Sequence, residues 1–512
     1  MENQSKRVNL LNVYYCNYWG MRILQTLFCA LFALSASATE LQIQGVPVVK
    51  SWQTDTSGDV KPDTVEIGEK EYVCRPYRLA RAEEDHEFSY MEVTTTSVGD
   101  LETLLGDKLE DIDSLVVHGP IGAEDFRTMW RASLYGYLSA INLEKADVED
   151  GKVPDNAFYH ENEQTQDGAF YYLLLRNIIL PEGVTVIGES AFERTYSLQT
   201  VHFPSTLRSI GTWAFQTCDI NMDPLVLPEG LETLGDYAFF CCWQLKGKVV
   251  LPSTIKRIGD RAFSNNQITE INLPEGLESM GLEALFYTNL KELDVPSTCL
   301  TFDFLGSQFA SNRWLERVHL PEGLVEIPRA MFHNCINLKE VNIPHSVKRI
   351  AEEVFTLCVS LKEMELPLGV ETVDKEAFQA MESLEQMVFS SSIKSLAYRS
   401  CIGWTRIKRI YCAAQEPPVA VEGTFDTYDA DRQPTVYVPE GTKEKYLAAP
   451  GWSGFTHYVE IPLSEFPATA VEAPAIVETD EADNAVYDLM GRRVTHPQSG
   501  HIYISKGKKV VF

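Results

Sequence analysis

Cysteine is the residue type in this chain best suited to chemistry, because a thiolate can attack a substrate or bind a metal. Several cysteines recur three positions after a phenylalanine or its equivalent, and they are Cys218, Cys242, Cys335, Cys358 and Cys401. The same slot in other repeats is assigned to Asn266, Asn289 and Asn312. A nucleophile or metal cluster would not tolerate that exchange, so we predict an interior structural position. A disulfide between stacked cysteines, such as Cys335 and Cys358, is the alternative.

Serine and histidine offer no stronger catalytic candidate. Ser253 and Lys256 fit the S-x-x-K pattern of some serine hydrolases, but a sister repeat carries glutamate at both positions. His202 and His319 share a strand position five repeats apart, which is roughly 24 Å in stacked coils and too far for a common metal. The sequence has no G-x-S-x-G, H-E-x-x-H, phosphate-loop or dinucleotide fingerprint. It therefore predicts a protein that is not an enzyme, with no catalytic residue, no metal site and no cofactor.

Carboxylates are abundant, and a pair about 5 to 10 Å apart is what a glycosidase requires. Here they occupy positions that face outward from short predicted strands, mixed with basic residues. The candidate ligand-binding positions on this face are Glu270, Asn272, Glu292, Asp294, Arg317, His319, Glu340, Asn342, Glu363, Glu365 and Arg409. A mixed-charge face of this kind is also what ordinary solvation produces. Aromatic residues are nearly absent from it, which argues against a platform that stacks sugars or bases.

The elements that position these residues belong to an internal repeat. Segments such as LPEGLETLGDYAF (227–239) and LPSTIKRIGDRAF (251–263) share one pattern, L-P-x-x-L-x-x-I-G-x-x-A-F-x-x-[CN]-x-x-L-x-x-V. The phenylalanines recur every 23 or 24 residues, at 192, 215, 239, 263, 286, 309, 332, 355 and 378. A period of this length lies in the leucine-rich-repeat range, where each unit buries its apolar face only by stacking on its neighbours.

The repeat predicts one parallel β-ladder and one apolar interior. The L-x-x-V-x-[LI] segment supplies a strand in every coil, and the proline after it ends that strand because it has no N–H to donate. The I-G-x-x-A-F segment suits a short helical or 3₁₀ turn, with the nine phenylalanines forming a continuous spine. Two repeats depart from the pattern, around 280–286 and 302–309, and we expect local irregularity there.

The phrase LPxxLxxIGxxAFxxC resembles the repeats of the BspA-like bacterial leucine-rich-repeat proteins. The resemblance covers residues 153–411 through the repeats. It extends to an N-terminal cap, through LVVHGPIGAEDFRTMWRAS (115–133), and to a C-terminal cap, through YVPEGTKEKY (437–446) and GWSGF (451–455). It implies an α/β repeat solenoid: a leucine-rich-repeat right-handed superhelix with a parallel β-ladder, N- and C-terminal caps and a small C-terminal β module.

The first 20 residues of the open reading frame are followed by a segment typical of export. From Met21 the chain has a basic Arg22, an apolar stretch shorter than the ~20 residues that span a bilayer, and small residues before a cut between Ala38 and Thr39. Acylation at Cys29 is the alternative, although the preceding Leu27 and Phe28 do not fit that signal. We expect an exported protein at the cell surface or outside the cell, without a transmembrane helix.

Composition supports that expectation and narrows the partners. With 44 basic against 73 acidic side chains, the formal charge of −29 repels phosphate backbones and excludes a primary nucleic-acid binder. Eleven cysteines are too few for a disulfide scaffold. The expected divisions are an upstream extension and signal peptide (1–38), an N-terminal segment (39–95), an N-terminal cap (96–152), the solenoid (153–411), a C-terminal cap (412–461), a linker (462–484) and a β module (485–512).

The last 28 residues resemble C-terminal modules of exported Bacteroidetes proteins, some of which are sorting signals, and a plain β-hairpin module is the alternative. The family resemblance implies a non-enzymatic protein that mediates protein binding or adhesion, to host or extracellular-matrix proteins or to other cells. Two other functions stay open. One is a glycan-handling or hydrolytic protein whose site lies outside the repeats, at 39–95 or in an insertion at 156–175. The other is a structural component of the envelope.

Overall fold

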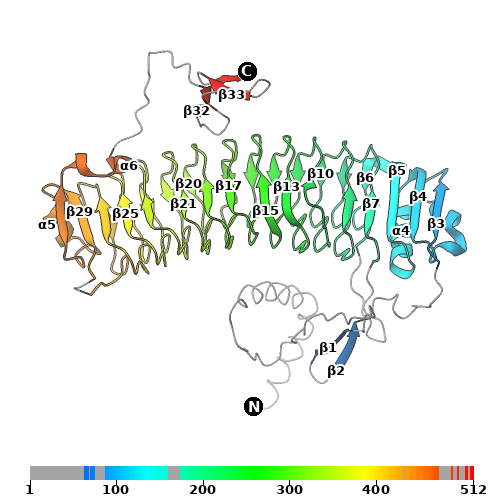
Figure 1. The fold of residues 1–512 in the computed structure, drawn as a ribbon, viewed down its shortest axis with the longest axis horizontal. Helices are drawn as coiled ribbons and strands as arrows, with labels where there is room; N and C mark the ends of the chain where they lie inside the picture. The colour runs from blue at the N-terminus through cyan, green and yellow to red at the C-terminus, as the bar shows by residue number, and fades with distance from the viewer. Residues whose placement is uncertain are drawn as a thin grey trace, which may run out of the picture.

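The computed structural model describes residues 87–159, 173–429 and 432–471 in full, together with the backbone of six strands outside those ranges. The fully described part is an elongated solenoid in which successive coils stack side by side (Figure 1). The predicted cleavage site at Ala38 and Thr39 and most of the insertion at 156–175 lie outside the described residues. The leucine-rich-repeat solenoid with a parallel β-ladder is confirmed.

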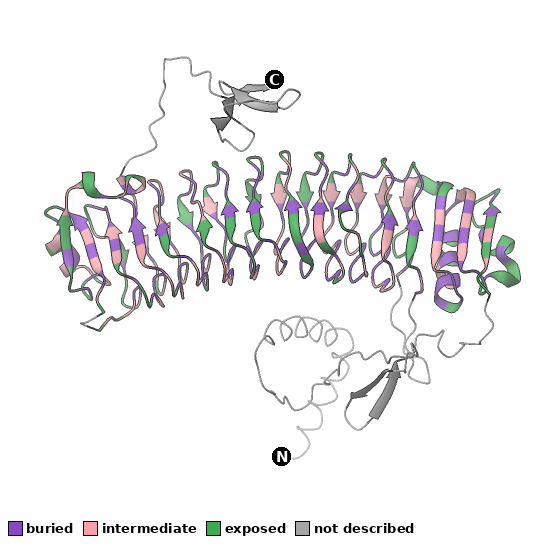
Figure 2. Cartoon of the chain, viewed as in Figure 1, coloured by how far each residue is buried: buried purple, intermediate pink, exposed green. Residues whose placement is uncertain are grey.

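Most coils contribute one strand to a first ladder, as predicted. The strands are β7 (Asn177–Ile179), β9 (Thr200–His202), β11 (Leu225–Val226), β13 (Lys246–Val250), β15 (Gln267–Asn272), β17 (Glu292–Asp294), β19 (Arg317–His319), β21 (Glu340–Val341), β23 (Glu363–Glu365), β25 (Gln386–Phe389), β27 (Arg409–Cys412), β29 (Thr435–Pro439) and β30 (Tyr458–Ile461). All pairs are parallel, but the ladder is split into four sheets, with breaks after β9, β15 and β21. Buried and exposed residues alternate along the strands (Figure 2).

A second ladder, not predicted from the sequence, runs along another side of the coils. Its two-residue strands are β6 (Lys152–Val153), β8 (Val186–Ile187), β10 (Ser209–Ile210), β12 (Thr233–Leu234), β14 (Arg257–Ile258), β16 (Ser279–Met280), β18 (Thr301–Phe302), β20 (Glu326–Ile327), β22 (Arg349–Ile350), β24 (Thr372–Val373), β26 (Ser395–Leu396) and β28 (Val419–Ala420). It forms a seven-stranded sheet that ends at β18 and a five-stranded sheet that begins at β20.

The turn before and after each phenylalanine is not helical, and the predicted helical or 3₁₀ turn is wrong. Instead, two residues per coil adopt the left-handed conformation, two positions before and two after the interior residue, as at Trp213 (φ 57°) and Thr217 (φ 58°) around Phe215. Backbone N–H groups there bond sideways: Trp213 donates to the carbonyl of Asp236 and Phe215 to that of Ala238. These lateral bonds satisfy the backbone without a helix, and they offset the strain of the left-handed residues.

The interior spine consists of two stacked runs of phenylalanine rings separated by a leucine. Phe158, Phe192, Phe215, Phe239 and Phe263 stack with centroids 5.1 to 5.4 Å apart, and Phe309, Phe332, Phe355 and Phe378 stack at 5.5 to 5.9 Å. The prediction of Phe286 as a spine residue is wrong. Leu285 is fully buried in its place, with its N–H donated to the next coil in the same way, and Phe286 is only half-buried.

From Pro181 to Pro321 the turns at the prolines alternate between P-E-G and P-S-T, and adjacent coils are clasped in pairs. Glu182 accepts hydrogen bonds from the backbone N–H (3.0 Å) and hydroxyl (2.9 Å) of Ser205, while the Gly183 N–H donates to the hydroxyl of Thr206 (3.0 Å). The same set recurs at Glu229 with Ser253 and at Glu275 with Ser297. In the coil at 367, Leu368 replaces the clasping glutamate.

The N-terminal end of the solenoid is closed by a cap of strands and helices. It comprises β3 (Tyr90–Thr94), α3 (Leu101–Leu105), η3 (Gly106–Lys108), β4 (Ser114–Ile121), α4 (Ala123–Tyr135), β5 (Ala140–Val148) and η4 (Glu149–Gly151). The cap strands continue the first ladder in the order β3-β4-β5-β7-β9. Asp125 is fully buried and accepts backbone N–H bonds from Gly99, Leu101 and Gly122, which joins α3 to the start of α4.

The C-terminal end is closed by an aromatic cluster and by a segment that folds back. α5 (Lys443–Ala448) places the buried Tyr446 against Trp452, with centroids 5.2 Å apart. η5 (Leu463–Glu465) and α6 (Ala468–Val471) follow β30. Outside the fully described ranges, β1 (Asp63–Ile67) pairs with β2 (Lys70–Cys74). The strands β31 (Val486–Tyr487), β32 (Arg493–Val494), β33 (Ile502–Ser505) and β34 (Lys508–Val511) form an antiparallel sheet.

Candidate functional site

The recurring cysteines are interior hydrogen-bond donors. Cys218, Cys242, Cys335 and Cys358 each direct the thiol at the carbonyl oxygen of the spine residue one coil earlier, over 3.0 to 3.2 Å. The amides of Asn266 and Asn312 make the same bond at 2.9 Å, and Thr195 makes it at 3.3 Å. Cysteine, asparagine and threonine can each donate this bond, which explains why cysteine and asparagine exchange there. All eight cysteines in the fully described ranges are free, so Cys335 and Cys358 form no disulfide in this structure.

Burial makes these thiols poor nucleophiles. Loss of solvation raises the pKa of Cys335 to about 12 and places that of Cys358 well above the ordinary range, where the neighbouring Cys335 adds to the effect. A thiol with such a pKa stays protonated at neutral pH, and the protonated form is the one that donates the hydrogen bond.

Two assignments to this slot were wrong. Asn289 lies one position beyond it, because the spine residue of that coil is Leu285 and the slot therefore falls on the buried Thr288. Cys401 occupies the spine position itself. In the other coils the N–H of the spine residue bonds to the carbonyl of the residue just before the next spine residue, and the N–H of Phe378 bonds to the carbonyl of Ser400. Trp404 takes the slot instead and donates its indole N–H to the carbonyl of Phe378 at 2.8 Å.

The outward side chains of the first ladder, here called the strand face, form lateral ion pairs between coils. Arg317 lies between Glu292 (2.9 Å) and Glu340 (3.2 Å), Lys339 pairs with Glu316 (2.8 Å), and Lys248 pairs with Glu270. The hydrogen bond from Lys339 lowers the pKa of Glu316. These groups are exposed, so each pair contributes little to stability and the charges remain accessible to a partner.

Two of the predicted positions on the strand face serve the backbone. The side-chain oxygen of Asn272 accepts the N–H of Leu251 (2.9 Å), and its amide donates to the Leu251 carbonyl (3.0 Å). Asn342 makes the same pair of bonds with Leu320, at 2.6 and 2.7 Å. In other coils a main-chain carbonyl accepts this N–H, so each asparagine replaces a missing ladder bond.

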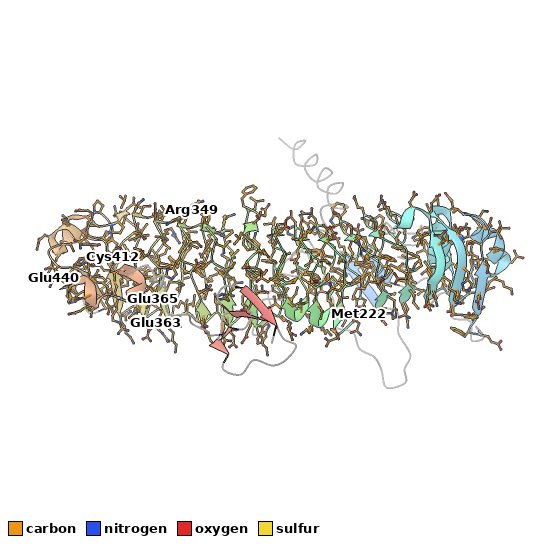
Figure 3. The ribbon with its side chains drawn as sticks, turned by 90° about the horizontal axis from the view of Figure 1, so that it is seen from above. Met222, Arg349, Glu363, Glu365, Cys412 and Glu440 are labelled. Carbon is orange, nitrogen blue, oxygen red and sulfur yellow. The ribbon has the colours of Figure 1, made fainter. Side chains whose placement is uncertain are left out.

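Other predicted positions are accessible. Asp294 and His319 are exposed and adjacent, as partners in the register of β17 and β19. Arg409 is half-buried, and its side chain donates to Gln386 at 2.9 Å. Glu363 is exposed, whereas Glu365 is half-buried. Both lie on one long side of the solenoid, and Arg349 of the second ladder lies on the opposite side (Figure 3).

The strand face is covered at its C-terminal end by the segment 462–471, here called the strap. The predicted linker (462–484) begins with these residues, yet Phe466 and Ala470 are buried against Val388 and Ala413. Tyr411 stacks on Tyr437 at 4.5 Å and meets the edge of Phe466. The backbone of the strap accepts N–H bonds from Leu368 (2.9 Å) and Ser391 (2.8 Å), so it bonds the coil pair that lacks a clasping glutamate. The strand face N-terminal to the strap, which includes β15 to β21, therefore stays uncovered in the described chain.

A separate cleft of about 360 Å³ lies between α4 of the cap and the first coil. Two half-buried aromatic rings line it, those of Trp130 and Tyr159, together with Glu124, Arg127 and Asp155. The guanidinium of Arg194 lies 5.8 Å from the centroid of Tyr159. The repeat pattern did not predict this cleft, because its residues come from elements that no repeat relates, although Tyr159 belongs to the insertion at 156–175 that the sequence left open as a site.

The described residues contain neither a metal-binding cluster nor a membrane-spanning helix. No group of three or more His, Cys, Asp or Glu side chains among them is placed to hold a metal ion. None of the described helices has the length and apolar character needed to cross a bilayer.

Comparison with known proteins assigns the repeats to a family. The family described as "BspA type Leucine rich repeat region" matches residues 163–291, 219–312 and 303–415, in six copies. No curated protein matches the chain.

Several solved structures are similar to this chain. A leucine-rich repeat protein from Bacteroides ovatus is 22% identical, with 69% of this chain and 94% of that chain covered and a TM-score of 0.38. A leucine rich cell surface protein from Faecalibacterium prausnitzii is 19% identical over 53% of this chain and 82% of that chain, with a TM-score of 0.30. The pneumococcal vaccine antigen PcpA is 16% identical over 81% of this chain and 99% of that chain, with a TM-score of 0.38. The six copies span the coils that carry the spine, the thiol slot and the strand face, and this chain belongs to the BspA-type leucine-rich-repeat family.

Proposed function

We propose that this protein acts at the cell surface or outside the cell by binding another protein along its solenoid, and that it performs no chemistry of its own. The observation that supports this most is the open strand face between β15 and β21. Its charged side chains are exposed and repeat from coil to coil, while the thiols of the same coils are buried and engaged as donors. A repeated surface on a stacked scaffold suits a partner that makes many contacts in parallel.

Charge defines the kind of partner that fits this face. Arg317 and Lys339 are each paired with glutamates of adjacent coils, whereas Asp294 and Glu363 form no salt bridge within the described residues. The whole chain carries a formal charge of −29. A partner with a basic surface, such as a host or matrix protein or a protein of another cell, would be attracted most strongly at low ionic strength.

The experiment is surface plasmon resonance of the intact exported protein over immobilised collagen, laminin, fibronectin and mucin, at about 50 and 300 mM salt. Binding that weakens with salt, and that falls further in the double variant Asp294→Lys, Glu340→Lys, supports a role for the strand face. The matched control is the pair Glu422→Lys and Glu440→Lys, two exposed glutamates outside the open face. Binding that is indifferent to both the salt and the strand-face changes removes the strand face from the function.

Glycan binding is a second candidate, and the cleft beside α4 favours it. Aromatic faces next to carboxylate and guanidinium groups suit a sugar ring, which has apolar C–H faces and a rim of hydroxyls. A glycan array tests it, with Tyr159→Ala as the variant expected to lose any signal. Turnover of a glycan by the purified protein would count against a purely binding function.

A further inference from the structure

The coil that departs most from the repeat pattern carries an apolar projection. In the other coils the spine residue follows the turn proline by 11 residues, but Phe309 follows Pro296 by 13. The two extra residues lie in the segment 303–307, directly after β18. Phe304, within this segment, has 81% of its surface exposed, the largest value among the exposed large hydrophobic residues of the described chain.

Neighbouring positions enlarge the apolar area. Leu300 (44% exposed), Leu305 (46%) and Val325 (63%) lie in the same coil or the next one. Leu300 and Val325 occupy the position directly before a strand of the second ladder, where seven other coils carry a charged residue. Those residues are Arg208, Glu232, Lys256, Glu278, Lys348, Glu371 and Lys394. Two adjacent coils have therefore lost the charge at this position, next to the inserted residues. We name Leu300, Phe304, Leu305 and Val325 the apolar knob.

The knob is held in one conformation by its own backbone and by the next coil. The carbonyl of Asp303 accepts the N–H of Gly306 (3.0 Å) and the buried amide of Gln308 (3.1 Å), and its carboxylate accepts the N–H of Leu305 (2.8 Å). Gly306 has a φ of 81°, and a Cβ there would lie 1.7 Å from the carbonyl oxygen of Arg329, so only glycine fits. A fixed projection loses little conformational entropy on binding, which favours affinity.

The rim of the knob is acidic. Glu278 lies beside Leu300, because Ser279 and Thr301 are register partners, and Glu322 precedes Gly323, which packs against Leu300. Asp303 adjoins Phe304. No salt bridge joins any of these three carboxylates to a lysine or arginine of the described chain. Two basic residues lie nearby: Lys348 beside Val325, and Arg329, whose guanidinium is paired with Glu352 and Glu353, beside Gly306. A second copy of this chain would place the same acidic rim against itself.

We propose that the apolar knob is the energetic anchor of a protein interface, and that its partner presents an apolar pocket bordered by lysine or arginine. The inference rests on the proposed binding function, and it places the main binding contact on the second ladder and not on the strand face. An exposed phenylalanine in a fixed loop, surrounded by aliphatic side chains, matches the apolar centre and charged rim of protein interfaces. The break between the sheets that end at β18 and begin at β20 provides room for the loop.

The test uses the intact protein over the same immobilised collagen, laminin, fibronectin and mucin. The double variant Phe304→Ser, Leu305→Ser should weaken binding by roughly tenfold or more. The rim variant Glu278→Lys, whose native side chain forms no hydrogen bond or salt bridge between coils of the described chain, should weaken it severalfold through the lost charge attraction. The matched control is Val419→Ser, another highly exposed apolar residue (71%) elsewhere on the second ladder. Because all these side chains are exposed, the thermal unfolding midpoints should stay close to that of the wild type.

The outcomes separate this inference from the function on which it rests. Absence of binding by the folded wild-type protein to every probe refutes the proposed function. Binding by the wild type that the knob variant retains refutes the inference and leaves the proposed function standing. Sedimentation velocity decides a third outcome: if the wild type dimerises and the knob variant is a monomer, the occupant is a second copy and the proposed partner is wrong.

Discussion

The hydroxyl of Thr469 donates a hydrogen bond of 2.7 Å to the carboxylate of Glu365, a residue 104 positions earlier in the chain. This contact attaches the strap to the strand face at the coil pair where Leu368 replaces the clasping glutamate. The N–H groups of Leu368 and Ser391 then bond to the strap carbonyls in place of a glutamate side chain. The strap is thus part of the solenoid, and it marks where the open strand face ends.

Replacing Phe466 by alanine should release the strap. The ring is 5% exposed and packs on Tyr411. Removal of a buried phenylalanine costs about 3 to 5 kcal/mol, and we expect this loss to exceed the free energy that holds the ten-residue strap on the strand face. Amide hydrogen exchange should accelerate at Leu368 and Ser391 and stay unchanged at Leu227, which bonds to the Val250 carbonyl far from the strap. Glu465→Ala, an exposed change in the same segment, is the control. Unaltered exchange at Ser391 in the Phe466 variant would show that the strap does not depend on this anchor.

The interior donor slot predicts opposite results for one substitution at two equivalent positions. The amide nitrogens of Asn266 and Asn312 both donate to spine carbonyls, but only the oxygen of Asn312 is used, by the N–H (2.7 Å) and hydroxyl (2.6 Å) of Thr288. The oxygen of Asn266 has no partner among the described residues. Asn266→Cys should therefore change the free energy of unfolding by less than about 1 kcal/mol, and Asn312→Cys should lower it by about 2 to 3 kcal/mol. Equal urea midpoints for the two variants would contradict this assignment.

Alkaline pH should destabilise the fold through its buried thiols. The pKa of Cys335 is raised to about 12 by burial, above that of an unfolded cysteine near 8.5. Between these values the folded state binds more protons than the unfolded state, so stability falls as pH rises. The contribution of Cys335 is complete below about pH 8.5 and disappears toward pH 12. The loss of melting temperature from pH 8 to pH 11 should be smaller in Cys335→Ala than in the wild type, and an identical loss would mean that this thiol does not titrate on unfolding.

The same burial predicts the reactivity of the thiols. Native protein at pH 8 should leave Cys218, Cys242, Cys335 and Cys358 unmodified by a thiol reagent, because each is buried and protonated. Unfolded protein should react at all of them. Mass spectrometry of the digested protein gives the reading, and rapid native labelling at Cys335 would contradict the interior assignment.

The repeat pattern predicts the strand, the proline turn and the interior phenylalanine because all three depend on local residue types that recur. The pattern gives a wrong prediction where the expected residue type does not lie at the expected position of the repeat. Its aromatic side chain favours Phe286 as the spine residue of this coil. Counting 11 residues from Pro274 reaches Leu285 instead, and the lateral hydrogen bond from Leu285 to Gln308 decides the register. The prediction for Cys401 is wrong for the same reason, because it followed the residue type and not the position counted along the repeat.

Other features had no signal in the sequence. The left-handed turn positions hold residues as different as Trp213, Tyr237 and Leu357, because bonds to the next coil, and not the side chain, sustain that backbone. The strap has two buried residues and no periodicity, and its partners range from Tyr411 to Glu365, far earlier in the chain. Its composition therefore predicted a linker. Each strand of the second ladder is two residues long, which is too short for an alternation of buried and exposed residues to be recognised in the sequence.

The central claim is that every coil places one side chain at the same point of the interior, and the coil between Phe263 and Phe309 tests it most directly. Equilibrium unfolding in urea of Leu285→Ala and Phe286→Ala measures it. We expect Leu285→Ala to lower the free energy of unfolding by about 2 to 5 kcal/mol, as for other fully buried leucines. Phe286→Ala, at a half-buried ring, should cost about 1 kcal/mol. A larger loss from Phe286→Ala than from Leu285→Ala would show that the coils are not stacked in this register.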